Sequence, residues 1–372
     1  MNLIPSPDPA GLPGPPWLFV CLLLLTQTVH VIFMNYVWGG SWFLLWLSLD
    51  RKTPWKDALY HRCLNVMPTA ISTAITFGVA PLLFVQVLYG QFFYTANVLM
   101  GWLWLTVLGL VLAAFYSVYL LKTGDKSQRT NVLSNLSVRS AIHLFVAVAF
   151  TATALLITAN AVLAIHPEVW SKAYTGSTLP TVWKGIEIFL PRFLHNAFGA
   201  LGIAGLWVVW IATYPGGRES TEKGARSGAV MAVCATAVQM GLGFWYLFSL
   251  PSEILKRMMS LSNLASVHLL IGVLLAIPLL VVKSLLVIIP THRILRWIAS
   301  VLAVLTVMSM VTVSEGLRQL FLENRFSLSD WNVQTQAAPV VLFLLLFISA
   351  VVVLAWIAKV VHAGFEERDT KE

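Results

Sequence analysis

Long apolar runs account for most of the chain, and polar residues gather in the short stretches between them. Such runs occupy residues 17–48, 64–92, 96–121, 140–165, 188–214, 226–250, 261–289, 294–322 and 336–362. A membrane-spanning helix needs about 20 predominantly apolar residues, so the pattern predicts an all-α, polytopic membrane protein with about nine transmembrane helices. The composition agrees, because only 11% of the residues are charged, against about 25% in soluble domains.

The order of the spans predicts two four-helix bundles followed by one extra helix. The predicted units are an outer-face tail at 1–16, a first bundle at 17–165, a second bundle at 188–322 that carries most of the candidate ligands, a ninth helix at 336–362 and a cytoplasmic tail at 363–372. Between the second and third spans, only Phe93 to Ala96 remains for a connecting turn.

The distribution of basic residues predicts the orientation of these spans. With the amino terminus outside, 17 of the 24 basic residues fall on one face, which the positive-inside rule makes cytoplasmic. They are Arg51, Lys52, Lys56, Arg62, Lys122, Lys126, Arg129, Arg139, Arg218, Lys223, Arg226, Lys283, Arg293, Arg296, Lys359, Arg368 and Lys371. We therefore expect a multi-pass protein of a bacterial cytoplasmic membrane, and the net charge of +8 is not read as a sign of nucleic-acid binding.

Three histidines lie within predicted spans, where a polar side chain is costly and a functional role is the first hypothesis. His195 and His268 are each seven residues inside the outer edge of a span, or roughly 11 Å deep at 1.5 Å per residue. Two imidazoles at one depth can bind one metal, and because no zinc or iron–sulfur spacing is present, we predict a haem iron held from two facing helices. His30, thirteen residues after Trp17, is expected deeper, at about 20 Å, unless its helix protrudes beyond the outer surface.

Other polar positions in the spans leave alternatives open. Glu315 lies seven residues before Leu322, so its carboxylate must be paired, protonated or bound to a metal; an ion pair with Arg318, ligation and proton handling are all compatible with this position. Gln86 could line a polar site or form a helix–helix hydrogen bond. His143 lies toward the inner face, where a structural role is expected.

The cysteines offer no covalent attachment site for haem. Cys21, Cys63 and Cys234 stand singly in or beside apolar runs, and none belongs to a C-x-x-C-H motif. We expect small, buried packing residues and no c-type haem in this chain.

The order and spacing of these residues resemble subunit I of the cytochrome bd quinol oxidases over nearly the whole set of spans. His30 matches the first-helix histidine that ligates a high-spin haem in that family. The segment from Arg192 to His195 matches its fifth-helix ligand of a low-spin haem, and His268 stands where its seventh helix offers a methionine. The resemblance therefore implies a bis-histidine low-spin haem b, within a total of one to three haems.

The eighth span carries a second part of the resemblance. The family has a glutamate followed three residues later by an Arg-Gln pair, and Glu315, Arg318 and Gln319 have this spacing. The resemblance gives Glu315 the role of a ligand to another high-spin haem. It gives Arg318 the role of balancing the charge of a haem propionate or of Glu315.

Three departures separate the chain from the family. The long loop between helices six and seven, associated with quinol oxidation, is reduced here to Pro251 to Ser260. An acidic residue that feeds protons to the oxygen site is replaced by Gln86, and an arginine beside the seventh-helix ligand is replaced by Ser266. Oxygen reduction consumes protons, and an amide cannot relay them as a carboxylate does. We therefore expect haem-based electron transfer more than oxygen reduction.

Three functions follow from these observations. The first is a haem b subunit of a membrane-bound respiratory oxidoreductase, which passes electrons between the quinone pool and a periplasmic partner such as a c-type cytochrome and works beside at least one other membrane subunit. The second is a terminal oxidase that is supplied by quinol or by cytochrome c. The third is a transporter without a cofactor, in which intramembrane histidine and glutamate side chains carry protons.

Overall fold

The computed structural model describes residues 4–126, 136–175, 183, 186–213, 219–338, 340–349, 352–353 and 356. Eight of its helices are long and apolar enough to cross a membrane. They are α1 (Pro16–Ser48), α2 (Pro54–Met100), α3 (Trp102–Lys126), α5 (Leu136–Ala164), α8 (Phe189–Thr213), α9 (Glu219–Phe248), α11 (Leu264–Ile288) and α12 (Arg293–Leu322). The prediction of an all-α, polytopic membrane protein is confirmed. Of the predicted ninth span, Val340–Ser349 is helical, and most of the remainder lies outside the described residues.

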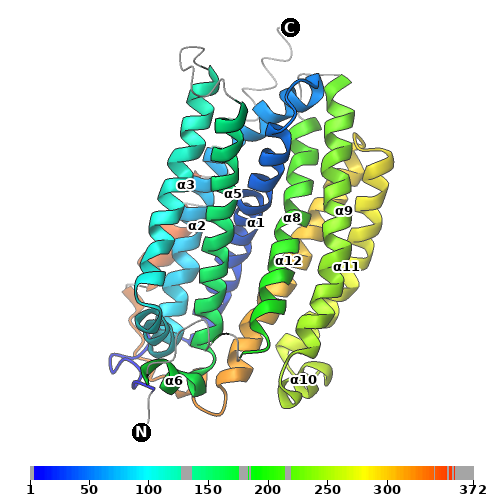
Figure 1. Ribbon diagram of the computed structural model, residues 1–372. Coiled ribbons are helices and arrows are strands. Elements are labelled where there is room, and N and C mark those ends of the chain that lie inside the picture. Colours follow the sequence, from blue (N-terminus) through cyan, green and yellow to red (C-terminus); the bar gives the residue numbers. More distant parts are fainter. Residues whose placement is uncertain are drawn as a thin grey trace.

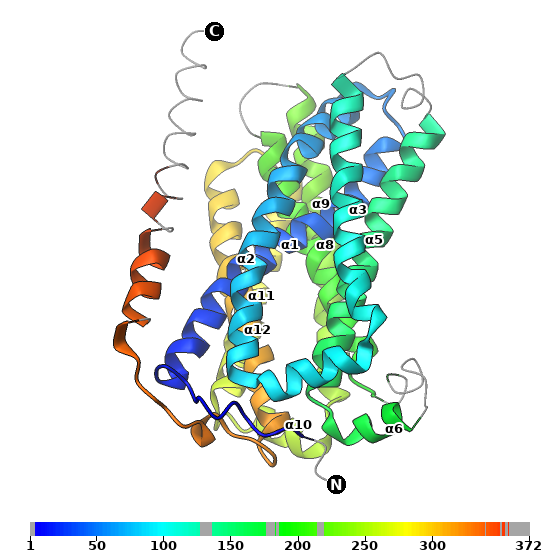
Figure 2. The same ribbon diagram turned by 90° about the vertical axis from the view of Figure 1, so that its left-hand side faces the viewer.

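The long helices stand side by side, and shorter elements cover one end of the bundle (Figure 1). These shorter elements are η1 (Pro167–Val169), α6 (Trp170–Tyr174), α10 (Ser252–Met259) and η2 (Leu328–Asp330). The first described residues lie at this same end (Figure 2). It is the end that the basic residues predict to face outward, and we call it the outer end.

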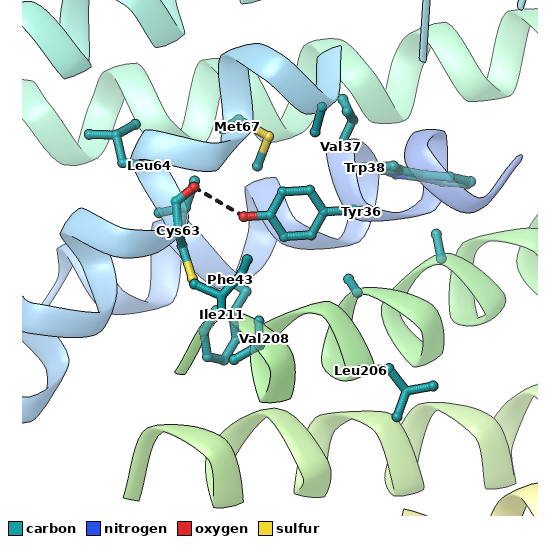
Figure 3. Close-up of a cluster of buried hydrophobic side chains, with 14 of the residues drawn as sticks. Tyr36, Val37, Trp38, Phe43, Cys63, Leu64, Met67, Leu206, Val208 and Ile211 are labelled. Carbon is teal, nitrogen blue, oxygen red and sulfur yellow. Dashed lines mark hydrogen bonds between the residues drawn. The ribbon is translucent and has the colours of Figure 1, made fainter. Parts of the chain in front are cut away.

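Helix α1 joins the two predicted bundles, because it packs against α2 and α5 on one side and against α8 and α12 on the other. As a result, both hydrophobic clusters of the interior draw residues from both halves of the chain. Figure 3 shows part of one cluster, where the hydroxyl of Tyr36 in α1 donates a hydrogen bond of 3.0 Å to the carbonyl oxygen of Cys63 in α2. Cys63 is buried there, as expected for a packing residue. Cys21 and Cys234 are exposed on the bundle, so the same expectation is wrong for them.

The predicted turn at Phe93 to Ala96 is wrong. Helix α2 instead bends at Tyr89, whose φ of −135° and ψ of 31° are not helical, and continues to Met100. After the bend, α2 runs across the outer end of the bundle before α3 begins (Figure 2). Burial of Phe92, among other side chains of this segment, favours its helical continuation. The turn comes at Gly101, whose φ of +53° suits a residue without a Cβ.

Helices α8 and α9 pack closely along their length, and small residues allow it. A Cβ added to Gly205 would lie 2.5 Å from the carbonyl oxygen of Gly228 and 2.6 Å from the backbone nitrogen of Ala232. The two backbones are therefore in direct contact, as in the small-residue interfaces typical of membrane helices.

We expect Gly205→Ala to destabilise the protein by about 1–3 kcal/mol, because the added methyl group forces α8 and α9 apart. Gly241→Ala in α9 is the control, since nothing lies within 4 Å of a Cβ at that position. Thermal unfolding of the detergent-solubilised protein, followed by tryptophan fluorescence, checks both variants. Equal midpoints for the two variants would contradict the packing argument.

Candidate functional site

His195 lies near the outer end of α8 and turns toward α9. Its Nδ1 lies 3.1 Å from the carbonyl oxygen of Gln239. Gly243, one turn further along α9, leaves the space that the ring fills, because a Cβ at Gly243 would lie 3.1 Å from the imidazole Cε1. The neighbouring helix therefore fixes both the position and the rotation of this ring.

His30 in α1 is held by α2 in the same way. Its Nδ1 lies 2.8 Å from the carbonyl oxygen of Ala74. A Cβ at Gly78 would come within 2.8 Å of the ring, so the glycine again makes room for the imidazole. Two histidines on different helices thus share one arrangement, a backbone carbonyl and a glycine one turn apart on the partner helix.

His268 in α11 is held by its own helix, because its Nδ1 lies 2.9 Å from the carbonyl oxygen of Leu264, four residues earlier. The ring is half-buried. The local helix begins at Asn263, whose side chain accepts a hydrogen bond from the backbone of Ser266 in a capping box. This cap fixes the start of α11 one turn before the histidine.

The three rings share a property that suits a metal ligand. A carbonyl oxygen only accepts hydrogen bonds, so Nδ1 must carry the proton in each ring. A neutral imidazole then keeps its lone pair on Nε2, the arrangement found in metal-ligating histidines, whose other nitrogen donates to a carbonyl or carboxylate. Within the described part of the chain, Nε2 of His30, His195 and His268 has no hydrogen-bond partner.

Contacts with α12 place His195 and His268 at similar depths. Arg192 in α8 donates a hydrogen bond of 3.2 Å to the hydroxyl of Ser314. Ala265 in α11 packs on Gly316, where an added Cβ would lie 2.4 Å from the alanine Cβ. Each histidine lies three residues further along its helix, so their depths agree within about one turn, or about 5 Å.

His30 lies at nearly the same depth, so the expectation that it is deeper than His195 is wrong. Gly39 in α1 packs on Ala200 in α8, where an added Cβ would lie 2.5 Å from the alanine carbonyl oxygen. His30 precedes this contact by nine residues and His195 precedes it by five, a difference of about 6 Å along the helices. The estimate from Trp17 failed because α1 is long and tilted (Figure 2), so its axial rise overstates depth.

Glu315 forms a compact polar network at the outer end of α12. The hydroxyl of Tyr89 donates to one carboxylate oxygen at 2.5 Å, and Arg318 forms an ion pair with the other at 2.5 Å. Gln319 donates a third hydrogen bond of 3.2 Å. The guanidinium of Arg318 also lies 5.1 Å from the centre of the Tyr89 ring. Both carboxylate oxygens thus already accept hydrogen bonds, and the geometry matches the ion pair with Arg318. A ligand role for Glu315 stays a prediction.

Gln86 does not join this network. Its side-chain oxygen accepts a hydrogen bond of 3.1 Å from the hydroxyl of Tyr94, across the bend at Tyr89. This bond lies within one bent helix and is not the helix–helix hydrogen bond expected as one alternative. A place for Gln86 in a polar site stays a prediction. The tyrosine that reaches Glu315 is instead Tyr89, which sequence reasoning missed because the bend that aims it follows from tertiary packing.

Lys283 lies inside the bundle, so its assignment to the cytoplasmic surface is wrong. The side chain is only 2% exposed. Its Nζ donates to the hydroxyl of Thr236 in α9 at 2.7 Å and to the carbonyl oxygen of Gly202 in α8 at 3.2 Å. Both acceptors are uncharged. The sequence did contain a sign of this burial, because Lys283 lies six residues before the end of the predicted span at 261–289.

His143 has a different environment, as predicted for a structural residue. It is buried, and its Nε2 lies 2.9 Å from the hydroxyl of Tyr60. This nitrogen is therefore already used, unlike Nε2 of the three histidines above.

Two of the segments that connect helices at the outer end are held by specific contacts. His166, which follows α5, packs on the ring of Phe321, and its burial lowers the pKa of the imidazole. Arg257 in α10 forms an ion pair with Glu323, and this hydrogen bonding lowers the pKa of the Glu323 carboxyl. The segment from Pro251 to Ser260 thus folds as the short helix α10 and lies against the end of α12.

No residues within the described ranges form a cluster of three or more histidine, cysteine, aspartate or glutamate side chains suited to a bare metal ion. A haem needs fewer protein ligands, because its macrocycle supplies four of the iron's ligands and the protein supplies one or two axial groups. The free Nε2 atoms of His30, His195 and His268 fit this requirement.

The fold and these positions define an all-α, polytopic membrane protein that holds oriented histidines inside its bundle. Among solved structures, it is similar to that of bd oxidase from Geobacillus thermodenitrificans, with a TM-score of 0.69 over 92% of this chain and 97% of that chain. The sequence identity is 14%, so this likeness shows the fold alone, which is bd-oxidase-like. No protein-family model matches the chain, and no curated protein matches its sequence.

We expect Lys283→Met to stabilise the protein by about 1–4 kcal/mol, because methionine fills a similar volume without burying a cationic group that has no anionic partner. Thr236→Val should have the opposite effect, by about 1–3 kcal/mol, because it removes an acceptor and keeps the lysine. Thermal unfolding midpoints of the two variants test the sign of each change. A loss of stability in Lys283→Met would contradict this argument, because it would mean that the two hydrogen bonds of Lys283 outweigh the cost of burying it.

Proposed function

We propose that the protein is a haem b subunit of a membrane-bound respiratory oxidoreductase, which transfers electrons between the quinone pool and a partner on its outer face. The observation that carries the proposal is the shared arrangement of His30, His195 and His268. These rings lie at similar depth on three helices, each with Nδ1 bonded to a carbonyl and Nε2 free. The bd-oxidase-like fold supports the same conclusion.

In this proposal His195 and His268 hold one low-spin haem b, and His30 holds a further haem. A bound haem would supply one-electron transfer. The protein sets the potential of the iron through the ligands it offers and the dielectric around them. The bond from Nδ1 to a backbone carbonyl raises the basicity of Nε2 and fixes the direction of its lone pair. The role of α9 and α2 is therefore to aim the His195 and His30 rings.

Arg318 and Glu315 have a supporting role in the proposal. Their ion pair lies about one turn nearer the outer end than His195 and His268. The hydroxyl of Tyr89 donates a hydrogen bond to the same carboxylate. A fixed pair of this kind stabilises charge in the low-dielectric interior without leaving an isolated ion. Gln86, bonded to Tyr94, offers no carboxylate for proton delivery.

The partners in the proposal are a quinone within the membrane, at least one other membrane subunit, and an acceptor or donor on the outer face such as a periplasmic c-type cytochrome. The short helix α10, held by Arg257 to Glu323, gives the outer end a compact surface in place of a long quinol loop. This is the feature that favours a separate electron-transfer partner. The alternative, a terminal oxidase, is favoured by the fold of the bd oxidase neighbour.

Reduced-minus-oxidised visible spectra test the haem proposal. We expect an alpha band of haem b in the purified protein, and His195→Ala and His268→Ala should each remove the low-spin signal because they remove an axial ligand. His143→Gln is the matched control, since that histidine also lies in a span but bonds to Tyr60. A wild-type protein without an alpha band would favour the transporter, and an unchanged spectrum in both alanine variants would reject the ligand assignment.

Electron acceptors distinguish the oxidoreductase subunit from the oxidase. With quinol as donor, we expect reduction of a soluble cytochrome c and little oxygen consumption, because the described polar network supplies no free carboxylate to relay protons to an oxygen site. Oxygen consumption is measured with an electrode, and cytochrome reduction by absorbance in the same preparation. Sustained quinol-dependent oxygen uptake that is lost in His30→Ala would instead establish the oxidase.

A further inference from the structure

A groove opens on the side of the bundle between α1 and α9, at the end opposite the outer end. Its volume is about 610 Å³, and it is open along the side of the bundle. The wall on α1 is aromatic, with Trp42 and Trp46, and Trp55 from the start of α2 extends it. Val230 and Met231 form the facing apolar wall on α9.

The charge of the groove changes along its length. Lys223 and Arg226 line it near the beginning of α9, and Val230 follows one turn deeper into the bundle. Trp46 is 41% exposed and Val230 is 43% exposed, so both present apolar surface to whatever fills the space. A cationic mouth above an aromatic and aliphatic channel is complementary to an amphiphile with a negatively charged head.

Some of the polar groups at the mouth of the groove form ion pairs or hydrogen bonds within the protein, and others do not. Arg226 forms an ion pair of 2.8 Å with Glu222, and Lys56 beside the groove forms one of 2.8 Å with Asp50. Lys223 makes no ion pair with any residue that the structure describes. No hydrogen bond from the indole N–H of Trp46 or Trp55 is found within the described ranges either.

The neighbouring aromatic rings are held in place. The ammonium of Lys56 lies 4.9 Å from the ring centre of Trp46 and 5.8 Å from that of Trp55, and the two indoles are 6.2 Å apart. The indole of Trp42 donates to the hydroxyl of Thr151 in α5 at 3.0 Å. These contacts, some of them cation–π interactions, keep the groove open and its wall rigid.

We propose that this groove binds an anionic phospholipid, with the phosphate beside Lys223 and Arg226 and one acyl chain along Trp42, Trp46 and Val230. Basic pockets between transmembrane helices at the cytoplasmic side of a membrane bind anionic lipid headgroups, and tryptophan is the residue preferred at the depth of the lipid headgroups. A quinone shares the apolar tail but carries no charge. Lys223, which has no ion pair among the described residues, and Arg226 beside it therefore favour the phospholipid.

Native mass spectrometry of the full-length protein in detergent provides the test. The protein is mixed with phosphatidylglycerol or with phosphatidylcholine of identical acyl chains, and the bound fraction is measured for each lipid. We expect wild-type protein to prefer phosphatidylglycerol, and Lys223→Gln with Arg226→Gln to lose about fivefold of that preference for each cation removed. Val230→Trp, which fills the channel, should reduce binding of both lipids at this site.

The matched control is Lys52→Gln with Lys256→Gln, which removes two exposed cations outside the groove. Unchanged phosphatidylglycerol preference in this control, with a loss in the Lys223 and Arg226 variant, supports the proposal. An equal loss of phosphatidylglycerol preference in both double variants would mean that the preference depends on the total positive charge of the protein. That result would overturn the proposal. Copurification of a quinone that Val230→Trp displaces, without a phospholipid preference, would also overturn it. Neither result depends on haem, so the proposed function is tested separately.

Discussion

In the interior of a membrane protein, each polar group must find its partner within the protein, because the surrounding lipid offers none. This constraint explains the form of the polar sites at Glu315 and at the three oriented histidines. Glu315 is bonded by Tyr89, Arg318 and Gln319, and each of the three oriented histidines uses a backbone carbonyl. The Nε2 atoms of these histidines remain without a hydrogen-bond partner in the described part of the chain. An unpaired polar atom within the membrane raises the free energy of the folded protein, and a bound ligand would offset this cost.

Glycine determines where the pairing can occur. Gly78 and Gly243 leave room for the rings of His30 and His195, and Gly205 lets the backbones of α8 and α9 touch. Without these residues the helices would stand further apart and the carbonyls of Ala74 and Gln239 would be out of reach. The close packing of these helices and the orientation of His30 and His195 therefore have one cause.

Hydrophobic runs predicted the eight long helices and the class of fold, because span length and apolarity are properties of the sequence alone. The positions of His195 and His268 at similar depth followed from counting residues in two helices of similar length. The same counting failed for His30, because the tilt of α1 is set by packing against its neighbours. The bend at Tyr89 and the burial of Lys283 were missed for a related reason, since a hydropathy window averages over the contacts that produce them. The ligand roles themselves stay predictions.

The histidines differ in what their orientation depends on. His30 takes its bond from Ala74 on α2 and His195 from Gln239 on α9, whereas His268 bonds to Leu264 in its own helix. If α1 shifts along α2, or α8 along α9, the bond from Nδ1 to the neighbouring helix is lengthened and the ring must turn to keep it. The His268 ring moves with α11 and keeps its orientation, because its hydrogen-bond partner lies in the same helix. In the proposed pair, a shift of α8 against α9 would thus change the orientation of His195 and leave the bond that orients His268 intact.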